Sequence, residues 1–214
     1  MTARRCQARI GDNRGMTNRR LLLQLPLVLG CLLVPGGPAT AADPAKPAAK
    51  PAMTLDLGGT TYFHRWSKNN EHEFTPQNDA DLQKWHDMVT IKVYEQASTP
   101  EKAADLANRM LATYRENGKV LKTASRPRTV ESPAEHLIVA MFGSPDALEA
   151  AFVRLMFVEG NAVAVVYSHR VYGSPAGPAM SKWLESDGGE AERALMLWKN
   201  LPRPAALKKL PASP

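Results

Sequence analysis

Cysteine is nearly absent from this sequence of 214 residues, and the two that occur, Cys6 and Cys31, both precede residue 42. Two cysteines are too few for a disulfide-rich scaffold. The sequence also has no apolar run of the roughly 20 residues that a membrane-spanning helix needs. An apolar content of 44% nevertheless excludes a mainly disordered chain. The length is sufficient for one ordinary globular domain.

A surplus of positive charge is also missing from most of the chain. The formal net charge is +6, but the first 41 residues hold six arginines and only one acid, Asp12. The remaining residues carry 21 basic and 20 acidic side chains. A nucleic-acid partner would require a basic patch, and the short basic runs at Arg126–Arg128 and Lys208–Lys209 are more typical of solvated segments. We therefore expect no nucleic-acid partner.

The first 41 residues have the three parts of a secretory signal peptide. Arg19 and Arg20 precede an apolar run over 21–34, and small residues at 39–42 form an A-x-A cleavage site. We predict cleavage after Ala41 or Ala42, with Met16 as the true start. The expected location is the periplasm, or outside the cell, and the mature chain would contain no cysteine.

Residues 28–31 also resemble a bacterial lipoprotein box, which would attach a lipid anchor to Cys31. The apolar run continues through Val34, whereas a lipoprotein usually becomes polar directly after the cysteine. We therefore favour cleavage near Ala41 without lipidation. The mature chain is then expected to begin with a Pro/Ala/Lys-rich linker over 42–56, followed by one domain over 57–201 and a flexible tail over 202–214.

The domain is predicted to open with a β-hairpin. Aromatic residues at 62–66 and 74 flank Asn69 and Asn70, a turn signal. A short helix is expected over 78–86, followed by a half-buried strand over 89–94. A three-residue turn would place His64 and His72 on one face of the hairpin, and a two-residue turn would place them on opposite faces.

The best-specified element is a helix from Pro100 to Asn117. Thr99 is a suitable N-cap, and Gly118 is expected to end the helix in a left-handed conformation. Strands are predicted over 119–125 and 135–142, and a central hairpin over 152–167. Two consecutive helices are expected over 178–201, with Asp187 and Glu190 forming a capping box. These elements predict an α+β fold, a mainly antiparallel sheet packed by helices.

The order of these elements resembles the PsbP/DcrB-like α/β/α sandwich of small secreted bacterial proteins and photosystem II extrinsic subunits. The resemblance covers roughly residues 60–201 and rests on the helix at 99–117, the strands at 119–121 and 137–139, the hairpin at 152–167 and the final helix at Trp198. The segment 66–93 is also similar to a family of uncharacterised periplasmic proteins. The resemblance implies a non-enzymatic accessory or binding role, and it supplies no catalytic residues.

Motifs for catalysis and for cofactors are missing. The sequence contains no nucleophile elbow, P-loop or dinucleotide fingerprint, so no cofactor is predicted and enzymatic activity has no positive support. A metal site is an alternative, because His64, His72 and Glu73 lie close together in the sequence and are suitable zinc ligands. No zinc-specific spacing accompanies them.

An aromatic group in the first hairpin and the segment after it is the main candidate for function. Trp, Tyr and Arg carry much of the binding energy of protein interfaces. We predict a non-enzymatic accessory or chaperone-like protein that binds an envelope or periplasmic protein or peptide. Alternatives are a metal-binding protein or metal-dependent enzyme, and a small-ligand carrier. The candidate binding surface consists of Tyr62, Arg65, Trp66, Phe74 and Trp85.

Overall fold

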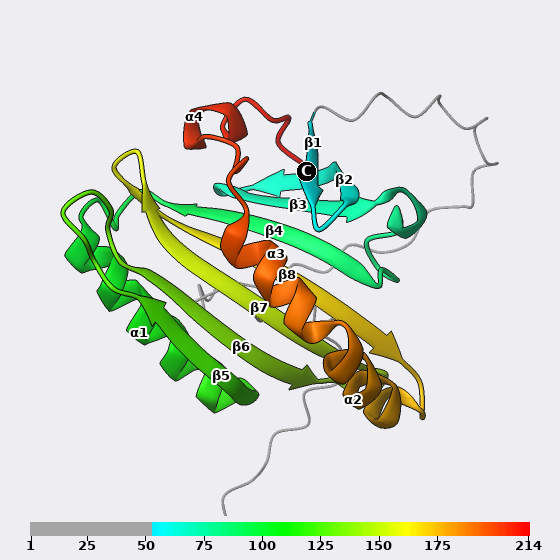
Figure 1. The fold of residues 1–214 in the computed structure, drawn as a ribbon. Helices are drawn as coiled ribbons and strands as arrows, with labels where there is room; N and C mark the ends of the chain where they lie inside the picture. The colour runs from blue at the N-terminus through cyan, green and yellow to red at the C-terminus, as the bar shows by residue number, and fades with distance from the viewer. Residues whose placement is uncertain (1–52) are drawn as a thin grey trace, which may run out of the picture. The chain divides into compact units, whose positions relative to one another are not determined.

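An antiparallel β-sheet organises residues 53–214, the part of the chain that this computed structural model describes (Figure 1). Its eight strands lie in the order β1-β2-β3-β4-β8-β7-β6-β5. The strands are β1 (Thr54–Leu57), β2 (Thr60–Lys68), β3 (Glu71–Pro76), β4 (Asp87–Tyr94), β5 (Lys119–Arg126), β6 (Glu135–Gly143), β7 (Ala147–Val158) and β8 (Asn161–Tyr172). The helices are α1 (Pro100–Asn117), α2 (Ala176–Ser186), α3 (Gly188–Leu197) and α4 (Pro204–Leu207), with a 3₁₀ turn, η1 (Gln77–Asp79).

The helices cover both faces of the sheet. α1 packs across β5 to β8, and its Tyr114 ring meets Phe142 of β6 edge-on, 5.0 Å between centroids. α2 and α3 pack on β7 and β8 from the other side, where Trp183 meets Phe152 at 6.0 Å (Figure 1). The α+β class and the antiparallel sheet between helices are confirmed. The predicted signal peptide, the start at Met16 and Cys31 lie outside the described residues.

α1 is close to the helix that the sequence predicts. The Thr99 hydroxyl accepts the Lys102 N–H at 3.2 Å, which caps the first turn. The prediction for Gly118 is wrong, because this residue is extended (φ −159°) rather than left-handed. Glycine fits there for a different reason: a Cβ atom would lie 2.6 Å from the Met141 carbonyl oxygen.

The first hairpin has the two-residue turn, with Asn69 and Asn70 at positive φ and Lys68 opposite Glu71. The expected consequence, His64 and His72 on opposite faces, is wrong. A β-bulge at Arg65 shifts the register, so that His64 lies opposite Phe74 and faces the same side as His72. Because the bulge adds one residue to β2, the β2 side chains that precede Arg65 point to the opposite face from the one expected for a strand without a bulge.

The segment between β3 and β4 is not the short helix predicted over 78–86. Only η1 is helical, and the rest is an irregular turn. Aspartate side chains bind the backbone here: Asp81 accepts the Gln83 N–H at 2.8 Å, and Asp79 accepts the Asp87 N–H at 3.0 Å. Such local bonds compete with helical ones.

Both ends of the domain are more ordered than the composition predicts. The expected linker reaches too far, because β1 pairs with β2 and buries Leu55 and Leu57. The expected tail also packs against the domain. Leu207 of α4 is fully buried, and the Ser213 N–H donates to the Ser67 carbonyl of β2 at 2.7 Å.

The break between α2 and α3 was predicted, but the capping box was not formed. Asp187 makes no cap hydrogen bond through its side chain, and instead accepts a bond from the Ser186 hydroxyl. The end of α3 is held by Arg154 of β7, which donates to the carbonyls of Leu195 and Trp198 at 3.0 and 2.9 Å.

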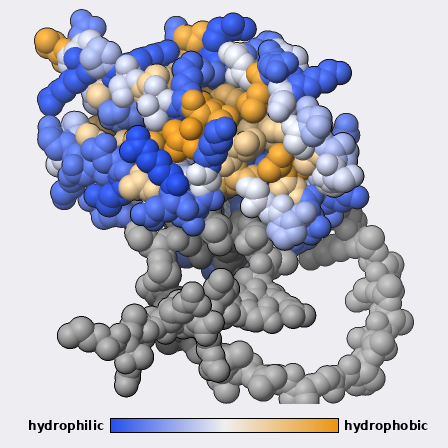
Figure 2. All heavy atoms as spheres, turned by 90° about the horizontal axis from the view of Figure 1, so that it is seen from below, coloured by the Kyte–Doolittle hydropathy of each residue, from blue (hydrophilic) through white to orange (hydrophobic). Residues whose placement is uncertain are grey.

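Some apolar side chains remain on the surface of the domain. Seen from below Figure 1, apolar residues gather in the middle of one face, with hydrophilic residues around them (Figure 2). Within residues 53–214, no helix is long and apolar enough to cross a membrane. The apolar surface in this view therefore belongs to the α+β domain, and none of it comes from a membrane-spanning helix of residues 53–214.

Candidate functional site

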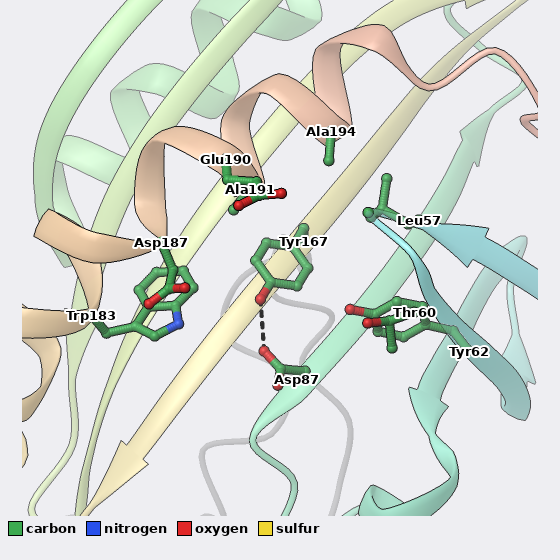
Figure 3. A pocket seen from close by; sticks show the side chains of 11 residues that line it. Leu57, Thr60, Tyr62, Asp87, Tyr167, Trp183, Asp187, Glu190, Ala191 and Ala194 are labelled. Carbon is green, nitrogen blue, oxygen red and sulfur yellow. Dashed lines mark hydrogen bonds between the residues drawn. The ribbon is translucent and has the colours of Figure 1, made fainter.

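A pocket lies between the β1–β2 turn, the sheet and the junction of α2 with α3. Its volume is about 290 Å³. The lining comes from six elements and the loops beside them (Figure 3). The residues are Leu57, Gly58, Thr60, Tyr62, Asp87, Tyr167, Trp183, Asp187, Glu190, Ala191 and Ala194.

One wall of the pocket depends on the tight turn between β1 and β2. Gly58 and Gly59 both have positive φ, 59° and 79°, which favours glycine at both positions. A Cβ atom on Gly58 would lie 3.4 Å from the Cβ of Ala194 in α3. The turn therefore approaches α3 closely and closes the pocket on this side.

Asp87 is the most constrained polar residue of the pocket. Its Oδ1 accepts the Tyr167 hydroxyl at 2.7 Å and is 2.9 Å from His169 Nδ1, which is the donor if this nitrogen carries the proton. Its backbone N–H is fixed by Asp79. The Asp87 side chain is 31% exposed. With Oδ1 engaged in these contacts, Oδ2 is the oxygen best placed to accept from a ligand.

Trp183 of α2 forms an aromatic wall. The His169 ring stacks on it with 4.0 Å between centroids and 8° between planes, and Tyr167 lies 6.3 Å away. Because His169 also contacts Asp87, these contacts connect the aromatic wall to the carboxylate. The stack restricts the rotamers of both rings and preorganises this side of the pocket.

The charge of the pocket lining is negative. Asp87, Asp187 and Glu190 contribute three carboxylates, and no lysine, arginine or histidine is among the lining residues. Burial, followed by the nearby charge of Asp87, raises the pKa of Tyr62 and of Tyr167, so both remain neutral phenols at ordinary pH. Carboxylates beside the faces of Tyr and Trp rings are the groups that stabilise an organic cation.

The structure does not bring the five predicted binding residues together on one surface. Tyr62, Phe74 and Trp85 are buried, at 4%, 0% and 3% exposure. Arg65 bonds to Thr75 on the opposite side of the sheet from Phe74, and Trp66 lies opposite Glu73 in the register. Tyr62 is the member of the set that lines the pocket.

The predicted metal ligands do not form a metal site. His64 Nε2 and His72 Nδ1 both lie 2.7 Å from the Ser67 hydroxyl, whereas Glu73 points to the other face of β3. Residues 53–214 contain no group of three or more histidine, cysteine, aspartate or glutamate side chains that could hold a metal ion. Burial, then the charges of His64 and Lys92, lowers the pKa of His72 to about 4.

Sequence reasoning missed most of the pocket because its residues come from distant elements. Asp87 and Tyr167 lie 80 positions apart and meet through the pairing of β4 with β8. The available signals were an aspartate at the start of β4 and acidic residues at the predicted helix break.

Comparisons with known proteins bear on the fold alone. The sequence matches no protein-family model and no curated protein. The structure is similar to the Ran-binding protein Mog1p of Saccharomyces cerevisiae, with 12% identity and a TM-score of 0.42, over 67% of this chain and 90% of Mog1p. It is also similar to a protein of unknown function from Pseudomonas aeruginosa described as a putative regulator, with 12% identity, a TM-score of 0.41, and 70% and 97% coverage. These likenesses are distant.

Proposed function

We propose that the protein is an exported, non-enzymatic binding protein whose pocket receives the positively charged side chain, lysine or arginine, of an envelope protein or peptide. The observation that carries the proposal is the lining: three carboxylates and three aromatic rings, with no lysine, arginine or histidine among the lining residues. A cation next to an aromatic face gains roughly 0.5–2 kcal/mol, more when water is excluded.

The arrangement suits binding better than catalysis. Asp87 is held by Tyr167 and His169, so its charge is fixed in place before a ligand arrives. A preorganised acceptor loses little conformational entropy on binding. No serine, threonine or cysteine beside a base lines the cavity; Thr60 is the one hydroxyl residue other than the tyrosines there.

The setting of this function follows from the predicted signal peptide. An exported domain would meet envelope proteins or peptides, which present lysine and arginine side chains on their surfaces. A side chain on a peptide and a small free amine share the same alkyl cation, so the pocket chemistry fits both sources. The peptide source is the one that agrees with the predicted role as an accessory protein.

The test is calorimetric titration of the full chain with an acetylated and amidated peptide carrying one central lysine. The control peptide carries norleucine at that position, which keeps the alkyl chain and removes the charge. We expect the lysine peptide to bind at least tenfold more tightly, and Asp87→Asn to abolish the difference. Asn at position 87 still accepts the Tyr167 bond but carries no charge.

Asp105→Asn is the matched control, since Asp105 is an exposed acid of α1 and does not line the pocket. Its affinity for the lysine peptide should equal that of the unmodified protein. Equal binding of the lysine and norleucine peptides would refute the cation pocket. An effect of Asp105→Asn as large as that of Asp87→Asn would also refute it, because the attraction would then reflect overall charge.

A further inference from the structure

We infer that the ligand of this pocket carries two positive charges joined by a short alkyl chain, as in a diamine, a polyamine or two adjacent basic side chains. This inference rests on the proposed function and specifies its ligand. The charge count is the first argument. A single cation would neutralise one of the three lining carboxylates and leave the other two without an opposite charge among the lining residues.

The three carboxylates lie at two levels of the pocket, one at the sheet and the other at the helix junction. Asp87 starts β4 on the sheet, and its side chain is 31% exposed. Asp187 and Glu190 are exposed and belong to the junction of α2 with α3. Figure 3 shows Asp87 at the hydroxyl end of the Tyr167 ring, Glu190 toward the opposite end and Asp187 next to Trp183. A ligand that contacts both levels passes the Tyr167 ring and requires a charge at each end.

Tyr62 provides a second polar group that faces the cavity. Its side chain is 4% exposed and lines the cavity, and no hydrogen bond joins its hydroxyl to another side chain of the described residues. The hydroxyl is not one of their fully buried, unpartnered atoms, so it is open to the cavity, where a ligand can replace water as its partner. An ammonium group donates up to three hydrogen bonds, and the Tyr62 hydroxyl beside Asp87 offers one of the acceptors.

The cavity volume agrees with a small linear ligand. About 290 Å³ holds a chain of a few methylene groups with an amine at each end, and it lies at the lower limit of the usual range for small-molecule sites. The apolar lining of Leu57, Ala191 and Ala194 is suited to the methylene groups between the charges.

The experiment compares 1,5-diaminopentane with pentylamine by calorimetry on the full chain at low salt. We expect the diamine to bind at least tenfold more tightly. The double variant Asp187→Asn with Glu190→Gln should reduce this preference to less than twofold. Glu192→Gln is the matched control on the same helix, because the Glu192 carboxylate binds Lys122 outside the pocket.

Each outcome decides between the two proposals. Equal affinity for the two amines would overturn the double charge and leave the cation pocket intact. Failure of both amines and of the lysine peptide would overturn the pocket itself. A third arm uses peptides with one or with two adjacent lysines. Tighter binding of the two-lysine peptide than of the diamine supports two charges and identifies a protein segment as the source; the reverse order supports two charges and identifies a free amine.

Discussion

The two faces of the sheet are covered by different kinds of helix, and the pocket lies on one of them. α1 is one continuous helix of 18 residues with a capped start and a buried stripe. The other face is covered by two shorter helices of 11 and 10 residues, interrupted at Asp187. Five side chains of this continuous helix are buried. The interrupted pair leaves a cavity at the break, and the acidic residues of the break line it.

The comparison shows that the helix break brings Asp187 and Glu190 to the pocket, where the proposed ligand would bind. Arg154 joins α3 to β7 and holds this helix on the sheet.

Arg154→Ala should lower the free energy of unfolding by about 3–5 kcal/mol, because it leaves a partly buried carboxylate and two carbonyls without their donor. Arg154 donates to both oxygens of Glu135 at 2.9 and 3.0 Å. Arg126→Ala is the control, since Arg126 contacts the same Glu135 from an exposed position, and should cost less than 1 kcal/mol. Urea unfolding measures both, and similar losses would contradict the account of α3.

Acidification should lower the free energy of unfolding through His72 of β3. Its pKa in the folded protein is about 4, below the ordinary value of 6.5, so the unfolded chain takes up the proton first. The contribution of His72 is complete above about pH 6.5 and is lost as the pH falls toward 4, by at most about 3 kcal/mol. Urea unfolding across this range measures the loss.

His72→Asn should flatten this pH dependence, since asparagine can bond to Ser67 without titrating. His136→Asn is the matched control: His136 makes the same kind of bond, to Ser125 at 2.9 Å, at an exposed position. We expect it to leave the slope between pH 6.5 and 4 unchanged. A slope that survives in His72→Asn would assign the effect to another group.

Alanine at two glycines should distinguish the tightly packed face from the looser one. Gly118→Ala, at the end of α1, should destabilise the protein by about 1–3 kcal/mol, because the new Cβ meets the Met141 carbonyl oxygen. Gly189→Ala, inside α3, has no atom within 4 Å of the new Cβ and should stabilise by about 0.5–1 kcal/mol. Thermal unfolding of both variants measures the change in stability on each face. A loss of stability in Gly189→Ala would contradict the open packing at the break.

The elements could be predicted from the sequence more completely than the site. α1 was predictable because its cap, its first proline and its apolar stripe are local signals. The bulge at Arg65 has no local signal, since it depends on how β2 pairs with β3. The burial of Leu207 has no local sequence signal either, because this residue stands among prolines and lysines. The pocket requires β4 beside β8 and the helix break beside both, which follow from tertiary packing.

The most direct test of the central claim is an NMR titration of the full chain with 1,5-diaminopentane that follows the indole N–H signals of its four tryptophans. Trp183 lines the pocket, whereas Trp85 and Trp198 are buried elsewhere. We predict that the Trp183 signal shifts and saturates while those of Trp85 and Trp198 stay in place. A Trp183 signal that does not move at saturating diamine would contradict the account.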